Sequence, residues 1–215
     1  MKKMFFAAVL LTVAFAVSAQ NGVIRELTGD VEIKSAGASA FVPAKQGDEI
    51  AQNTIVSTGF KSTAIVAVGS SVITVRPLTR LTLAEISSSS GTENLNVNLQ
   101  TGRVKVDVKP PAGSKANCTV QGPSATASVR GTSFEFDGQN LSVSEGTVAF
   151  AGNSGAPATM VSGGGSSFVG VDGKPANPAD VSNADLTPPV PVGTPDTPST
   201  PPQASNGDLD ISLDY

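Results

Sequence analysis

Two carboxylates close together in the sequence are the first residues whose types could do chemistry. Glu135 and Asp137 alternate with two phenylalanines, so on a β-strand both would stand on one face, about 7 Å apart. Carboxylate pairs carry out the acid and base steps of glycosidases. The same alternation also describes a strand with one buried and one solvated face. We favour the solvated face and assign no catalytic residue.

Cys118 is the only cysteine, and the chain has no histidine that could activate its thiol. Histidine is a common activator of reactive thiolates, and without one we expect Cys118 to be a small buried residue. With no histidine, zinc binding is not expected. Asp30, Asp48 and Asp137 do not have the spacing of a calcium loop. The sequence therefore predicts no metal and no cofactor.

Two glycine-containing motifs could also bind ligands. The stretch 163–167 lacks the Lys-Ser/Thr ending of a phosphate loop, so we expect a flexible turn before a last strand. In the triplet Arg130, Gly131 and Thr132, the glycine would allow a tight turn that presents the guanidinium to a carboxylate. The alternative is an internal partner for Arg130 and a structural turn. We favour the structural turn.

Charge is distributed unevenly along the chain, whose net charge is −4. Residues 20–171 contain 11 basic and 11 acidic residues, whereas residues 172–215 contain seven aspartates and one lysine. A neutral body with scattered basic residues gives no electrostatic footprint for nucleic acid. We expect no nucleic-acid partner.

Apolar residues at every second position indicate that β-strands carry the candidate side chains described above. Such runs are typical of strands with one face in a core, and no run has the 3.6-residue apolar stripe of a helix. We therefore predict an all-β fold of two packed sheets with a coiled, roll-like winding, between a β-sandwich and a short β-helix. The predicted strands are 29–34, 63–68, 72–75, 81–83, 95–99, 104–108, 133–136, 141–143, 148–150 and 168–171.

The N-terminus has the three parts of a secretory signal peptide. Lys2 and Lys3 precede an apolar run over 4–17, and Ser18 and Ala19 follow it where a peptidase would cut. The apolar run is short for a membrane span. We predict a signal peptide over 1–19, a folded domain over 20–171 and no stable membrane span after cleavage.

The last part of the chain differs in composition. Residues 172–215 contain nine of the 15 prolines, and residues 172–207 are predicted to be a disordered spacer because they cannot bury enough apolar surface. At its end, 208–215 form a strand-like tag, and such a peptide can add to an exposed sheet edge of a partner or of its own domain. The alternative is a frayed terminus. The apolar residues that alternate in the tag are Leu209, Ile211, Leu213 and Tyr215.

An ordered set of short motifs over about 22–146 resembles the FecR domain, a bacterial extracytoplasmic all-β module. The set comprises 29–33, 47–50, 55–59, 62–72, 75–81, 102–104 and 127–134, and the last segment, Ala-Ser-Val-Arg-Gly-Thr-Ser-Phe, is the most specific. It makes Arg130, Gly131 and Thr132 a framework signature of the family.

The resemblance implies a fold, a compartment and a tendency to bind proteins. The best-known family members are transmembrane regulators of a cytoplasmic sigma factor, but we expect a signal peptide in this chain at the place where they carry a membrane helix. We therefore expect a non-enzymatic, periplasmic, secreted or cell-surface module that binds proteins of the bacterial envelope. The alternatives are a self-assembling structural envelope protein and, less favoured, a cell-wall enzyme or a transmembrane signalling regulator.

Overall fold

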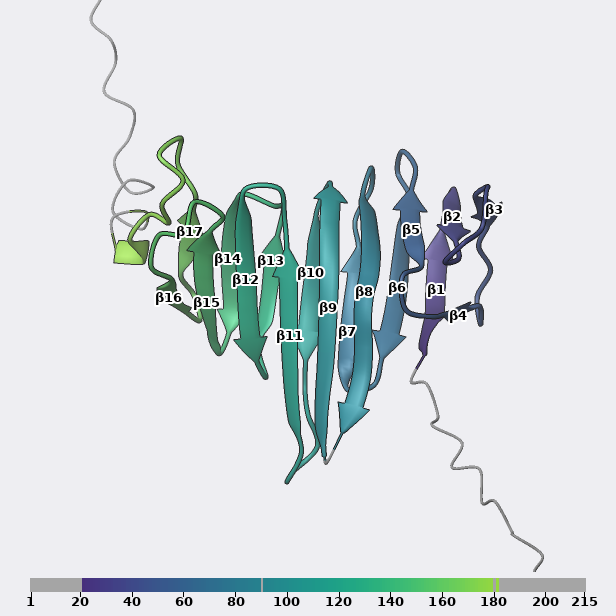
Figure 1. The fold of residues 1–215 in the computed structure, drawn as a ribbon, viewed down its shortest axis with the longest axis horizontal. Helices are drawn as coiled ribbons and strands as arrows, with labels where there is room; N and C mark the ends of the chain where they lie inside the picture. Colours follow the sequence, from purple (N-terminus) through teal and green to yellow (C-terminus); the bar gives the residue numbers. More distant parts are fainter. Residues whose placement is uncertain (1–20, 90, 180, 182–215) are drawn as a thin grey trace, which may run out of the picture.

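The computed structural model describes residues 21–89, 91–179 and 181, and nearly all the regular secondary structure in this part of the chain is β-strand. The strands form two sheets, which confirms the predicted all-β fold of two packed sheets. Figure 1 shows the N-terminal strands at one end of the molecule and the C-terminal strands at the other. The predicted signal peptide 1–19 and the tag 208–215 lie outside the described residues, as does most of the predicted spacer.

The first sheet has eight strands. Their spatial order is β17 (Ser166–Phe168), β14 (Asn140–Glu145), β13 (Ser133–Phe136), β10 (Val104–Val108), β7 (Ser71–Val75), β6 (Thr63–Val68), β1 (Gly22–Thr28) and β4 (Glu49–Ile50). The second sheet has nine strands. Their order is β16 (Thr159–Ser162), β15 (Thr147–Gly152), β12 (Ala125–Arg130), β11 (Lys115–Gln121), β9 (Thr92–Thr101), β8 (Arg80–Ser89), β5 (Ile55–Thr58), β2 (Val31–Lys34) and β3 (Val42–Pro43).

The chain winds between the two sheets as it advances. The pairs β6–β7 and β13–β14 lie in the first sheet, the pairs β8–β9 and β11–β12 lie in the second, and the single strand β10 crosses to the first sheet between the last two pairs. Both sheets grow in the same direction along the chain. All the strand pairs are antiparallel except β9 with β11, which are parallel because β10 crosses to the other sheet between them. This alternation is the roll-like winding that the sequence predicts.

Apolar side chains from both sheets meet in one core. The inward positions follow period 2, as in β10, where Val104, Val106 and Val108 are buried and the residues between them are half-buried. Phe136 on β13 and Phe150 on β15 bridge the two sheets, with ring centroids 6.0 Å apart and ring planes at 81°. Such edge-to-face contacts stabilise beyond the area that they bury.

Seven of the described strands are not among those predicted, namely β1, β3, β4, β5, β11, β12 and β16. Two of them, β3 and β4, have only two residues each, and others give a weak apolar pattern. In β11 and β12 most inward positions hold small residues, such as Cys118 and Ala127. In β1 the pairing with β6 shifts register between Ile24 and Glu26, which breaks the alternation. A search for apolar residues at every second position therefore misses strands that contain small inward residues or a bulge.

The described fold continues past Val171. Ala176 N donates to Phe168 O at 2.8 Å, and Ser167 Oγ donates to Ala176 O at 2.7 Å. A β-bridge also joins Val169 to Pro175. These residues cover the outer edge of β17. No helix within the described ranges is long and apolar enough to cross a membrane.

The contact between Phe136 and Phe150 generates a stability prediction. Phe136→Ala should lower the free energy of unfolding by about 3–5 kcal/mol, because it leaves a cavity between the sheets. The exposed Phe60 is the control, since Phe60→Ala should change stability by less than about 0.5 kcal/mol. Urea titration followed by circular dichroism measures both. Equal effects of the two substitutions would contradict this account of the core.

Candidate functional site

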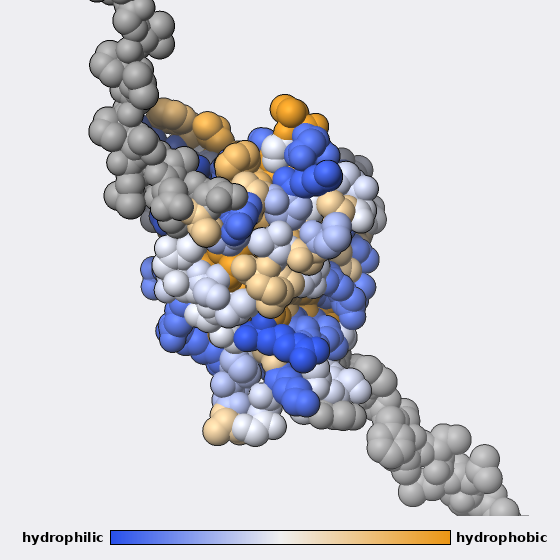
Figure 2. Space-filling model, turned by 90° about the vertical axis from the view of Figure 1, so that its left-hand side faces the viewer, coloured by the Kyte–Doolittle hydropathy of each residue, from blue (hydrophilic) through white to orange (hydrophobic). Residues whose placement is uncertain are grey.

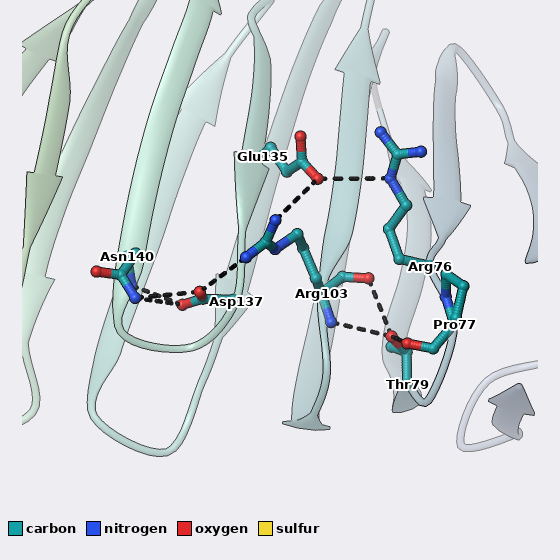
Figure 3. Close-up of polar contacts among 7 residues, drawn as sticks. All are labelled: Arg76, Pro77, Thr79, Arg103, Glu135, Asp137 and Asn140. Carbon is teal, nitrogen blue, oxygen red and sulfur yellow. Dashed lines mark hydrogen bonds and ion pairs between the residues drawn. The ribbon is translucent and has the colours of Figure 1, made fainter. Parts of the chain in front are cut away.

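A charged depression lies where four neighbouring strands of the first sheet end or turn. Its side chains come from β13, from the β13–β14 turn, from the β9–β10 turn and from the segment after β7 (Figure 3). The depression is open and encloses about 770 Å³. Its lining residues are Arg76, Pro77, Leu78, Gly102, Arg103, Glu135, Asp137, Gln139 and Asn140.

Two arginines and two carboxylates form a chain of ion pairs across the depression. Glu135 Oε1 lies 3.4 Å from Arg76 Nε and 3.9 Å from Arg103 Nη1, and Asp137 Oδ2 lies 3.5 Å from Arg103 Nη2. Arg76 Nε is buried and makes no well-directed hydrogen bond in the described structure, so its contact with Glu135 is electrostatic. Half-exposed pairs of this kind contribute about 0–1 kcal/mol each. Their main effect is to fix where the charges lie.

Asp137 also holds the turn between β13 and β14. Its Oδ1 accepts hydrogen bonds from the backbone N–H groups of Asn140 at 2.7 Å and Gln139 at 3.1 Å. Burial raises the pKa of Asp137, but the hydrogen bonds from Asn140 and Gln139, together with the charge of Arg103, outweigh it and lower the pKa below its ordinary value. Asp137 therefore acts in this structure as an ionised turn-forming residue.

Two buried threonines tie the loops around the depression together. Thr58 Oγ1 donates to Arg76 O at 2.6 Å and accepts from Thr79 N at 3.0 Å. Thr79 Oγ1 accepts from Arg103 N at 2.9 Å. Buried hydroxyls bonded to main-chain groups are costly to displace. The segment 76–79 is consequently fixed to both β5 and the β9–β10 turn.

This fixed segment presents a large apolar side chain to solvent. Leu78 is 59% exposed and has φ = 56°, a left-handed conformation that is rare and costly for leucine. Its N–H donates to Gly59 O at 3.1 Å. The residue after Gly59 is Phe60, which is 72% exposed, with Lys61 Nζ 5.6 Å from the centroid of its ring. Two exposed apolar side chains thus lie on hydrogen-bonded neighbouring loops.

Gly102 allows the β9–β10 turn to approach this segment. Its φ is +88°, and a Cβ added there would lie 2.5 Å from Thr79 Cα and 2.7 Å from Leu78 O. Only glycine fits both the backbone conformation and the space. The loop that carries Leu78 therefore rests directly on the turn that carries Arg103.

The candidate residues from the sequence fall in several places. Glu135 and Asp137 share Arg103, so the expected charged face is engaged in ion pairs. Arg130 lies at the end of β12 and donates from Nε to Asn117 Oδ1 at 3.0 Å. Gly131, with φ = 67°, links β12 to β13, and Thr132 is buried.

Gly163 to Gly165 form the turn between β16 and β17, with Gly165 N donating to Ser162 O at 2.9 Å. Within residues 21–89, 91–179 and 181, no three His, Cys, Asp or Glu side chains come close enough to hold a metal ion. The residues Leu209, Ile211, Leu213 and Tyr215 lie outside the described residues.

Sequence reasoning missed Phe60 and Leu78. Each is a single apolar residue between strands, and isolated exposed apolar residues are common on protein surfaces. A sequence signal does exist, because Phe60 follows a glycine and Leu78 follows a proline, at turn positions where large apolar residues are unusual. Phe60 and Leu78 come close together through the hydrogen bond between Leu78 N and Gly59 O, which the sequence pattern does not reveal.

The environment of Asp137 predicts a pH dependence of stability. Because folding lowers its pKa, the stability that it contributes is present above the pKa of the unfolded chain and is lost as the pH falls through the folded-state value. Asp137→Asn keeps an acceptor oxygen but removes the charge. The difference in unfolding free energy between the two proteins should shrink as the pH falls from about 6 to about 3. A pH-independent difference in urea titrations would show that the charge has no such role.

Cys118 is 1% exposed, and burial raises the pKa of its thiol to about 12. A protonated, inaccessible thiol reacts slowly with disulfide reagents. The native protein should therefore give no rapid reaction with an aromatic disulfide reagent at about pH 8, and one equivalent should react after unfolding in guanidinium chloride. Rapid labelling of the native protein would contradict the buried position.

No curated protein matches the chain. Two crystal structures of a candidate anti-sigma factor from Parabacteroides distasonis ATCC 8503, at 1.65 Å and 2.50 Å resolution, are similar at 15% and 14% identity, with TM-scores of 0.46 and 0.45. Each alignment covers 60% of this chain and 62% of the other, so this chain spans less than two thirds of their length.

A family model described as "FecR protein" matches residues 54–149. This confirms the resemblance seen in the sequence, although the motifs at 29–33 and 47–50 precede the matched residues. The match includes Phe60, Leu78 and the ion pairs of Arg103. The depression and its apolar loops therefore lie within the part of the chain that matches the FecR family model.

Proposed function

We propose that the chain is a non-enzymatic protein-binding module that works outside the cytoplasm of a bacterial cell and contacts a protein of the envelope. The FecR domain supports a regulatory or signalling role, and the predicted signal peptide supports the compartment. The binding surface that we propose consists of Phe60, Leu78 and the ion pairs of Arg103 with Glu135 and Asp137. We call it the loop surface.

The exposure of Leu78 in a left-handed conformation is the observation that carries the proposal. A leucine there costs stability twice, through backbone strain and through apolar surface left in water. Asparagine or glycine would remove both costs. A residue that is unfavourable for the isolated fold indicates a contact that is made only with a partner.

The surroundings of Leu78 have the make-up of a protein-binding surface. Leu78 and Phe60 offer apolar anchors on loops held by buried hydrogen bonds, so little ordering is needed on binding. The arginines and carboxylates beside them are fixed in alternating order, which suits a partner with matching charges. The described chain has no histidine, and its two carboxylates in the depression are bound by arginines. These features support binding over catalysis.

Substitution of Leu78 tests the proposal because stability and binding should change in opposite directions. Leu78→Asn should leave the free energy of unfolding unchanged or raise it by up to about 1 kcal/mol. It should lower partner capture from envelope extracts at least about tenfold, as expected for loss of an apolar anchor. Phe60→Ser should also lower capture with little change in stability.

Val42→Asn provides a matched control. Val42 is also an exposed aliphatic residue, 52% exposed, but it lies on the edge strand β3 and does not line the depression. Its substitution should leave capture unchanged. The captures should use protein recovered from the periplasm or medium. Equal capture by all variants would overturn the binding surface, and recovery from the cytoplasm alone would overturn the compartment.

A further inference from the structure

The outer edge of β16 differs from the other three sheet edges. The edge strands β3 and β4 each have only two residues, and β3 contains Pro43. The edge of β17 is covered by Pro175 and Ala176. Short strands, prolines and covering loops are the usual protections of a sheet edge. β16 has four residues, Thr-Met-Val-Ser, without a charge or a proline.

β16 is therefore able to pair with a further strand at its outer edge. It is hydrogen-bonded to β15 on one side and is the last strand of its sheet within the described residues. Val161 points into the core, whereas Met160 is 61% exposed. An open groove of about 470 Å³ runs beside the strand, lined by Met160, Ser162, the glycines 163–165 and residues 177–179.

An exposed apolar side chain lies beside the groove at this end of the molecule. Met160 lines the groove, whereas the exposed Phe168, on β17 of the other sheet, lines a separate pocket with Leu141 and Val181. Figure 2 looks onto this end and shows hydrophobic atoms among hydrophilic ones on its surface. Exposed apolar groups beside an unprotected edge favour cover by a further segment.

The chain itself supplies such a segment at the right place. The described chain ends at Val181, close to the groove, whose lining includes residues 177–179. From 182 to 207 there are 26 residues before the tag 208–215. This connection contains seven prolines, so its span lies between roughly 28 Å for a flexible chain and roughly 80 Å for a fully extended polyproline helix. Either span lets the tag reach β16 within the same molecule, where its effective concentration does not depend on the protein concentration.

The tag has the pattern that the edge requires. Leu209, Ile211, Leu213 and Tyr215 alternate with aspartates and a serine, so on a strand all four apolar residues share one face. That face can continue the inner, apolar side of the sheet beyond Val161. The aspartates would then face water, where a charge at the new edge discourages pairing with further chains.

We infer that residues 208–215 of the same molecule add to the free edge of β16 as an extra strand of the second sheet. This inference goes beyond the proposed function, because it concerns a surface that is separate from Phe60 and Leu78. The added strand covers the groove beside Met160. It also prevents two copies of the protein from pairing through β16.

Amide hydrogen exchange of the full-length chain tests the inference. In the unaltered protein the edge amides of β16 should be protected, and removal of 208–215 should raise their exchange rate at least about tenfold. Ile211→Asp should have the same effect because it places a charge on the inner face of the added strand. Ser212→Asp introduces the same residue on the outer face and should leave the protection in place.

Light scattering and dilution separate the two possible sources of the strand. The inference requires a monomer in which protection of β16 does not depend on protein concentration. Protection that falls on dilution together with a dimer mass would mean that the tag of a second copy occupies the edge, which overturns the inference. Equal exchange in the full-length chain, the shortened chain and Ile211→Asp would also overturn it. Neither result depends on partner capture by the loop surface.

Discussion

Each strand of this protein must bury one apolar face against the opposite sheet, and the rest of the structure follows from that constraint. A hairpin with one apolar face cannot be stable alone, so the chain crosses to the other sheet after nearly every hairpin. Phe136 and Phe150 show the result, because residues from different sheets meet edge to face in the core. The crossings place many turns at the ends of the sandwich.

The turns around the depression can form a binding surface because hydrogen bonds hold them in place. Thr58 and Thr79 donate and accept hydrogen bonds inside the fold and connect segments that are about twenty residues apart in sequence. Their bonds hold Leu78 in a conformation that leucine does not favour. The sandwich supplies the stability that makes such local strain tolerable, and the strained loop in turn supplies the surface that we propose for binding.

The sequence allowed the sheets to be predicted better than the site. Strands such as β10, with valine at each inward position, are visible from period 2 alone. β11 and β12 are not, because Ala116, Cys118 and Ala127 are too small to give an apolar signal. The pairing of Glu135 with Arg103 depends on contact between strands more than 30 residues apart, which no local pattern encodes. The exposure of Leu78 depends on the same long-range arrangement.

We therefore propose two separate surfaces, a loop surface that contacts a partner and a sheet edge that the protein covers with its own chain. The most direct test of the first claim is photo-crosslinking in living cells, with a photoreactive amino acid at Phe60 or at the control position Val42. The account predicts a crosslinked envelope protein from position 60 and none from position 42. Crosslinks that are equal at the two positions, or absent at position 60, would contradict it.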